Sequence, residues 1–165
     1  MLLSHLHMFF ITCQFYSIPF SNSQKIIRSL PGYDGDLPFS FETGYVGVGQ
    51  NEEVQLFYYF VESQRNPEED PLLLYLPGGP GGSALVTLLC QIGPLSFKVD
   101  NDIKNLTLTL NPYSWTKLSN IIFMDIPAGV GYSYGETNEA SVSSDTNMVT
   151  QATDFVKKVT AKFRS

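Results

Sequence analysis

Cysteine is scarce in this chain of 165 residues, which contains only two. Cys13 lies in an apolar N-terminal stretch, so removal of that stretch would leave Cys90 without a second cysteine in the chain. One cysteine excludes an internal disulfide framework. We therefore expect Cys90 to be either a small buried apolar residue or a thiol without a partner.

Histidine is equally scarce. The chain has 2 histidines, His5 and His7, and both lie close to Met1 in the same N-terminal stretch. No later residue can therefore act as the histidine base of a Ser-His-Asp relay. We also expect no metal site and no cofactor.

Basic residues are fewer than acidic ones: Lys and Arg number 10, Asp and Glu number 16, and the net charge is -6. The basic residues are scattered and form no patch that could follow a phosphate backbone, so nucleic acid is not an expected partner. The hydrophobic content of 43% is sufficient for one domain with its own core.

The N-terminal stretch itself is apolar and is followed by small polar residues. This order is typical of a secretory signal peptide, which we place at residues 1–23, before one domain at residues 24–165. Gln14, Ser17 and Pro19 interrupt the stretch, which makes it a poor membrane-spanning helix. A buried N-terminal strand is the alternative.

A glycosylation sequon supports the same route. Asn105 is followed by Leu106 and Thr107, which fits the pattern N-x-[ST]. We expect a glycan at Asn105 and a secreted or vacuolar protein.

The first half of the domain carries strand patterns. Residues 43–49 and 54–62 are rich in aromatic and β-branched side chains, and the polar residues between them predict an antiparallel hairpin. Residues 72–76 form a continuous apolar run, which is typical of a strand covered on both faces, and we place it at the centre of a sheet. A glycine-rich turn and a short helix at residues 83–91 follow.

The second half alternates in the same way. Residues 97–99 and 106–110 predict a further hairpin or two irregular strands, and residues 120–125 predict a second buried strand. Apolar residues then recur at helical spacing behind an N-cap at Ser144 or Asp145. A hairpin followed by buried strands and helices predicts an α/β fold with a mixed sheet.

The apolar face of the last helix needs a sheet to cover, and no strand pattern follows it. We therefore interpret the chain as the front part of a longer domain, cut off before the next strand. On this interpretation the last central strand keeps an open edge, and Phe155 and Val159 lose part of their cover.

The glycine-rich turn, residues 77–84, lies between a buried strand and a helix, and this position leaves three interpretations open. Its backbone N–H groups could form an oxyanion hole, with Gly78 and Gly79 as donors. It could be a dinucleotide fingerprint, because residues 79–84 fit G-x-G-x-x-A and Asp100 follows, although Pro80 removes an N–H and the helix is short. It could also be only a tight turn that requires glycine.

A series of blocks occurs in order along the chain: Leu37-Pro38-Phe39, Glu42 to Gly47, Leu56 to Phe60, Gly78 to Gly81, Ile92-Gly93-Pro94, Asn111 to Trp115 and Asp125 to Tyr134. Together these blocks resemble the serine carboxypeptidase-like family, and the resemblance runs from about Ile26 to the end of the chain. The plant branch, with its peptidases and its acyltransferases that use glucose esters, is the most similar.

The resemblance implies an incomplete α/β-hydrolase fold. It implies that Gly79, with Gly78 adjacent, supplies a backbone donor of the oxyanion hole. In the family the nucleophilic serine lies on a later G-[ED]-S-Y-[AG]-G elbow, with the acid and the histidine later still, and this sequence contains no such elbow. We therefore expect a chain that is inactive alone. A small secreted binding or regulatory protein is the alternative.

Residues 131–135 also fit the nucleophile-elbow pattern G-x-S-x-G, with Ser133 at its centre. An elbow follows its strand directly and begins a helix. Residues 127–130 separate Ser133 from the preceding strand, and Gly135 follows. We expect Ser133 to be structural, as the corresponding block is in the family.

The chain departs from the family pattern at the substrate carboxylate. Family peptidases bind it partly through an Asn before the glycine pair and a Glu close before the Gly-Pro that ends the helix, and here these positions hold Pro77 and Gln91. Both changes weaken the peptidase interpretation relative to acyl transfer, so the expected substrates are a peptide C-terminus or an acyl-glucose ester. Gly82 likewise stands where the family has a Cys with a distant partner.

Overall fold

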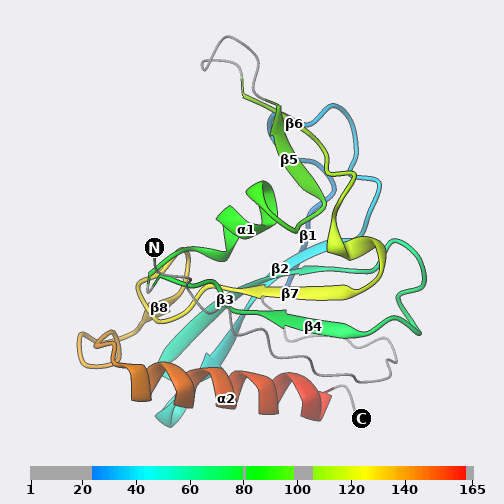
Figure 1. Ribbon diagram of the computed structural model, residues 1–165. Helices are drawn as coiled ribbons and strands as arrows, with labels where there is room; N and C mark the ends of the chain where they lie inside the picture. Colours follow the sequence, from blue (N-terminus) through cyan, green and yellow to red (C-terminus); the bar gives the residue numbers. More distant parts are fainter. Residues whose placement is uncertain (1–23, 80, 99–105, 163–165) are drawn as a thin grey trace, which may run out of the picture.

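The computed structural model describes residues 24–79, 81–98 and 106–162, and in that part of the chain a mixed sheet lies between two helical layers (Figure 1). The elements in chain order are β1 (Lys25–Ile26), β2 (Phe41–Val48), η1 (Gln50–Glu52), β3 (Val54–Val61), β4 (Leu72–Tyr75), α1 (Ala84–Cys90), β5 (Leu95–Lys98), β6 (Thr107–Leu110), η2 (Trp115–Lys117), β7 (Asn120–Met124), β8 (Tyr134–Gly135) and α2 (Asp145–Lys162). The expected signal peptide and Asn105 lie outside the described residues.

The main sheet has the order β1-β2-β3-β7-β4, and β8 pairs with β3 beside this path. The hairpin of β2 and β3 is confirmed, with Phe41 opposite Val61 and Val48 opposite Val54. β7 runs antiparallel to β3 and parallel to β4. β5 and β6 form a separate antiparallel pair, which confirms the second hairpin.

The sequence-based placement of β4 at the centre is wrong. β7 lies between β3 and β4, so among the described strands β4 pairs with β7 alone. The strand that retains an open edge is thus β4 and not β7. A continuous apolar run reports that both faces of a strand are covered, as they are here, and says nothing about its lateral neighbours.

The side chains of the central strands alternate between two cores because successive residues of a strand point to opposite faces. From β7, Ile122 and Met124 join the core under α2, whereas Ile121 and Phe123 join the core under α1. The residues of β3 alternate in the same way, with Tyr58 in the core under α2 and Tyr59 in the core under α1. Figure 1 shows α2 along one face of the sheet, and α1 with the β5–β6 hairpin on the other.

The expectation that Phe155 and Val159 lose part of their cover is also wrong. Phe155 is 1% exposed and Val159 is 4% exposed, and both pack on the face formed by β2, β3 and β7. The Phe155 ring meets Tyr58 at a centroid distance of 6.2 Å. The helix itself begins as predicted, because the Ser144 hydroxyl accepts a hydrogen bond from Asn147 N at 3.1 Å.

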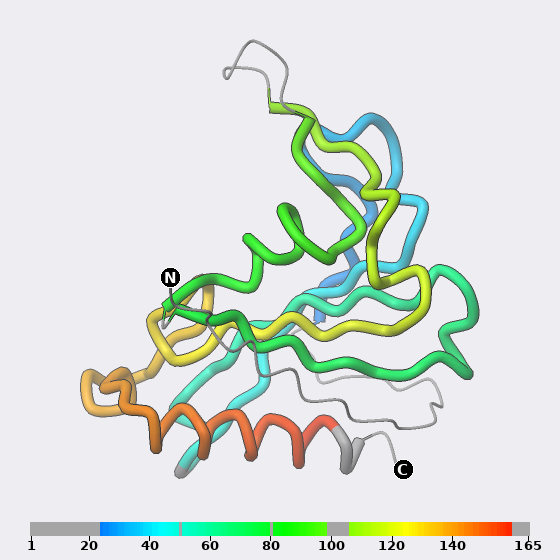
Figure 2. Tube along the Cα trace, in the orientation of Figure 1, coloured from blue at the N-terminus to red at the C-terminus, as the bar shows by residue number. Residues whose placement is uncertain are grey.

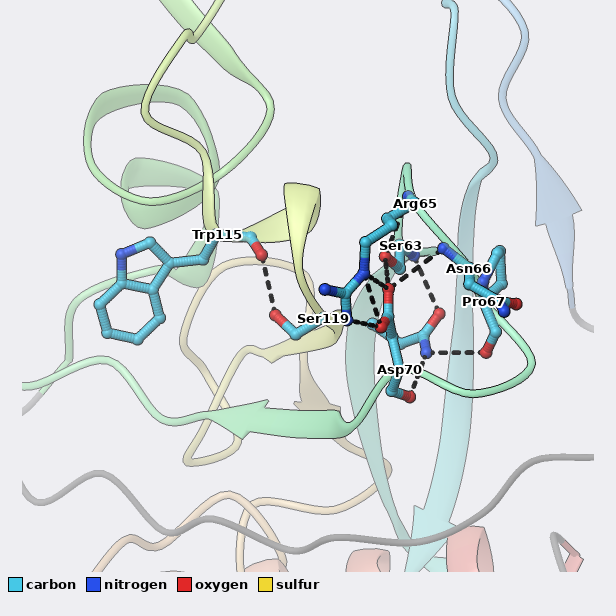
Figure 3. A network of polar contacts seen from close by, with 8 residues as sticks. Ser63, Arg65, Asn66, Pro67, Asp70, Trp115 and Ser119 are labelled. Carbon is cyan, nitrogen blue, oxygen red and sulfur yellow. Dashed lines mark hydrogen bonds and ion pairs between the residues drawn. The ribbon is translucent and has the colours of Figure 1, made fainter.

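A polar network at the start of β4 and β7 fixes the register of these two strands (Figure 3). Asn120 is 1% exposed, and its Oδ1 accepts from Ser63 N at 2.9 Å. Its Nδ2 donates to the Pro67 and Asp70 carbonyl oxygens, each at 3.0 Å. The buried Asp70 carboxylate also forms an ion pair with Arg65 and accepts from the Ser63 hydroxyl at 2.5 Å. The network thus holds the 63–70 loop against the first residue of β7.

Candidate functional site

Two loops meet at the carboxyl ends of β4 and β7. Because these strands are parallel neighbours, the glycine turn after β4 and residues 125–133 after β7 emerge at the same edge of the sheet. Figure 2 shows the green segment after β4 and the yellow segment after β7 turning at this edge. Ligand sites of open α/β sheets are typically found there.

The glycine turn is folded tightly on itself. Gly79 has φ 153° and Gly81 has φ 93°, a region that side chains disfavour. A Cβ at Gly79 would lie 3.0 Å from Gly81 N, and one at Gly82 would lie 2.8 Å from the Gly78 carbonyl oxygen. Gly78 and Gly79 are exposed at its tip. The turn therefore requires glycine at several positions and presents main chain to solvent.

The turn continues into α1, which begins as predicted. Ser83 is the N-cap, and its Oγ accepts from Leu85 N at 3.2 Å. The same Oγ donates to Asp125 Oδ1 at 2.9 Å, and Ala84 N donates to that oxygen at 2.8 Å. The carboxylate of Asp125, the residue directly after β7, thus fixes the end of the turn.

Asp125 is the site residue that the sequence interpretation missed. It is 0% exposed, and its second oxygen, Oδ2, accepts from Tyr132 N at 3.1 Å and from the Tyr59 hydroxyl at 3.4 Å. Burial first, and the Asp125 charge second, raise the pKa of the Tyr59 phenol, which keeps it a protonated donor. The available signal was an acidic residue directly after the apolar run Ile121 to Met124.

The second loop contains Ser133, which is buried and structural in its contacts. Its Oγ accepts from Phe57 N at 2.7 Å and donates to the Asp125 carbonyl oxygen at 2.7 Å. The hydroxyl therefore joins β3 to the end of β7. The structure supports the expectation that this G-x-S-x-G pattern is not a nucleophile elbow.

Aromatic rings hold the second loop against β2 and β3. The Phe57 ring lies 5.1 Å from Tyr132 and 4.9 Å from Tyr45, and Tyr45 lies 5.6 Å from Tyr134. Tyr132 and Tyr134 are half exposed. These contacts position the Tyr132 amide that donates to Asp125.

The two residues expected at the substrate carboxylate lie on either side of the segment formed by the glycine turn and α1. Pro77 is half-buried directly before the glycine pair, and Gln91 is the exposed C-cap of α1. The hydroxyl of Tyr75, in β4, donates to Gln91 Oε1 at 3.4 Å, and Asn111 Nδ2 donates to the Gln91 carbonyl oxygen at 3.1 Å. The Gln91 side chain is therefore connected to the strand that leads to Pro77.

The dinucleotide interpretation does not fit this arrangement. α1 leads to β5, which pairs antiparallel with β6 in the second sheet instead of lying parallel beside β4. Asp100 lies outside the described residues. Within the described ranges, no group of three His, Cys, Asp or Glu side chains is arranged for a metal ion.

Cys90 is exposed at the end of α1. It is therefore a free thiol and not the small buried apolar residue that was the alternative expectation. Across the part of the chain that the structure describes, no helix has the length and apolarity needed to cross a membrane.

Comparison with known proteins identifies the family of this chain. The family model of serine carboxypeptidase matches residues 31–165. The chain belongs to the serine carboxypeptidase family. Serine carboxypeptidase-like 15 of Arabidopsis thaliana is 50% identical over 92% of this chain, and Serine carboxypeptidase-like 1 of the same plant is 49% identical over 95%. The chain spans 35% of the length of each of these relatives.

A solved structure agrees on the fold. Kex1(delta)p, a prohormone-processing carboxypeptidase from Saccharomyces cerevisiae, superposes with a TM-score of 0.58 at 20% identity. The match covers 77% of this chain and 29% of that protein. The expectation of an α/β-hydrolase fold is thereby confirmed.

Proposed function

We propose that residues 77–83 supply the oxyanion-hole segment of a serine carboxypeptidase-like site, with the Gly79 amide, and Gly78 beside it, as donors. One observation carries the proposal: an exposed glycine turn lies at the carboxyl ends of two parallel strands, and the Asp125 carboxylate accepts a hydrogen bond from Ala84 N at the end of the turn. Rigid backbone donors stabilise the negative charge that develops during acyl transfer.

The 165-residue chain is inactive on its own under this proposal. Its two histidines lie near Met1, its one G-x-S-x-G serine is bonded into the fold, and it contains no G-[ED]-S-Y-[AG]-G elbow. We expect no peptidase, esterase or acyl-transfer turnover and no labelling by a fluorophosphonate probe. Stoichiometric labelling at Ser133 would contradict this, and saturable ligand binding without turnover would favour the alternative of a secreted binding protein.

The oxyanion role is testable in a hybrid. Residues 24–165 replace the matching part of Serine carboxypeptidase-like 15, and Gly79→Ala is compared with the unchanged hybrid. A Cβ at Gly79 meets the turn's own main chain, so we expect kcat to fall by about 10²–10³-fold. Gly35→Ala is the control, because Gly35 also has a positive φ, 80°, but a Cβ there meets no atom within 4 Å. Equal turnover in all three proteins would refute the role.

Pro77 and Gln91 favour acyl transfer from a glucose ester over release of C-terminal residues. Pro77 has no side-chain hydrogen bond to offer, and Gln91 cannot be a protonated acid facing a carboxylate. In the hybrid, Pro77→Asn with Gln91→Glu should raise hydrolysis of a peptide with a free C-terminus relative to acyl transfer from a glucose ester. An unchanged ratio would argue against this assignment.

The proposal also includes the secretory route. Expression in a eukaryotic cell should yield a product that has lost about residues 1–23 and carries a glycan at Asn105. N-terminal sequencing and the mass change after glycan removal measure both. An unglycosylated cytosolic product that retains Met1 would contradict the route.

A further inference from the structure

The glycine turn is tied to one strand at both of its ends. Before the turn, Tyr75 of β4 pairs with Phe123 of β7. After the turn, Ser83 and Ala84 donate to the Asp125 carboxylate, and Asp125 comes two residues after Phe123. Two residues of extended chain span about 7 Å, so both legs of the turn are held on a short stretch of β7 and its end.

The Asp125 carboxylate has no acceptor capacity left for chemistry. Its oxygens accept from Ser83 Oγ, Ala84 N, Tyr132 N and the Tyr59 hydroxyl. An ionised carboxylate offers about four lone-pair sites, and these contacts use them all. It is buried, and two of its four hydrogen bonds come from main-chain N–H groups, so its contacts hold the main chain.

Gly131 makes room for this carboxylate. A Cβ at Gly131 would lie 1.9 Å from Asp125 Oδ2, and Gly131 has φ 55°. Gly129, in the same loop, has φ 89°, but a Cβ there would meet no atom within 4 Å. Both glycines have a positive φ, and they differ in that only a Cβ at Gly131 would meet the carboxylate.

We propose that Asp125 is a positioning residue that sets the geometry of the Gly78–Gly79 turn, a role that rests on the proposed function of that turn. Ser83 and Ala84 transmit the position of the carboxylate to Gly82, and Gly82 lies against the Gly78 carbonyl oxygen. Displacement of Asp125 therefore moves the tip of the turn although the carboxylate does not touch it. The bond to Tyr132 N fixes the second loop against the same group.

The test compares the backbone amide signals of Gly78, Gly79 and Ala84 in the ¹⁵N-labelled 165-residue chain and its variants. Asp125→Asn replaces one accepting oxygen by an NH₂ group, which then faces hydrogen-bond donors instead of acceptors. Gly131→Ala displaces the carboxylate but keeps its charge. Both should shift all three signals and should speed hydrogen exchange at Ala84 by about tenfold or more, the size expected for losing a hydrogen bond to a charged group. Gly129→Ala is the matched control and should leave the three signals in place.

The outcomes separate positioning from a general loss of stability. Gly129→Ala also places a side chain at a positive φ, and at 89° a less favourable one than the 55° of Gly131, so equal shifts in Gly129→Ala and Gly131→Ala would overturn the proposal. Wild-type signals in both Asp125→Asn and Gly131→Ala would also overturn it. If Asp125→Asn does not fold, Gly131→Ala and Ser83→Ala, which removes one donor to the carboxylate, decide in its place. Amide shifts as expected, with unchanged turnover of the corresponding hybrid proteins, would support the positioning of the turn and refute its oxyanion role.

Discussion

Replacement of Asn120 by alanine should be among the most damaging single changes in this chain. The side chain is 1% exposed and bonds Ser63 N, the Pro67 carbonyl oxygen and the Asp70 carbonyl oxygen. Alanine leaves these main-chain groups without that partner at the junction of the 63–70 loop and β7. Each buried polar group left unpaired costs about 1–3 kcal/mol. The bonds to Ser63 N and to the Asp70 carbonyl oxygen are buried, so we expect a loss of about 2–6 kcal/mol in the free energy of unfolding, against a total of about 5–15 kcal/mol for a typical domain.

Urea unfolding followed by far-UV circular dichroism measures this loss. Asn147→Ala is the matched control, because Asn147 also bonds a carbonyl oxygen, that of Val142, but is exposed. The control should change the free energy of unfolding by less than about 0.5 kcal/mol. Asn120→Asp should also destabilise, since it faces two carbonyl oxygens with an acceptor. A loss below about 1 kcal/mol for Asn120→Ala would refute the view that this network fixes the strand register.

Two further predictions concern the same fold. Phe155→Ala should lower the free energy of unfolding by about 3–5 kcal/mol, because Phe155, on α2, is fully buried against the sheet. Val149→Ala, on the exposed side of α2, should change it little, and similar urea midpoints for the two variants would contradict this packing. The hydrogen bond from Arg65 lowers the pKa of Asp70 to about 2, so the ionised form stabilises the fold above the unfolded value of about 4. That contribution should fade as the pH falls from about 4 through 2, and Asp70→Asn should have a flatter dependence of urea midpoint on pH over this range.

Local patterns were sufficient to predict most of the elements. β2, β3, α1, β7 and α2 were all indicated by runs or periods that their own residues carry, and the N-cap at Ser144 follows from the same local logic. The two-residue β1 has too few residues for a pattern, and the sequence analysis missed it. The lateral position of β4 depends on which strand pairs beside it, and its apolar run contains no such information.

The candidate site divides in the same way. The glycine turn was indicated by composition, and the family resemblance assigned Gly78 and Gly79 a role. The Asp125 cluster was not indicated, because its partners come from residues far away in the chain: Ala84 is separated from Asp125 by 41 positions and Tyr59 by 66. A buried carboxylate is recognised by the donors that converge on it, and that convergence exists only in the folded chain.

Through these hydrogen bonds, both loops of the candidate site are attached to a residue at the end of a core strand. β7 is buried along its whole length and is paired on both sides. The glycine turn begins at a pairing with β7 and ends on a carboxylate at the end of β7, and Ser133 attaches the second loop to the main chain of the same residue. An exposed glycine-rich turn has high conformational entropy unless it is held, and donors must be held in advance to stabilise a developing charge. Attachment of both loops to the end of β7 is what the proposed oxyanion role requires, and the tip of the turn stays exposed.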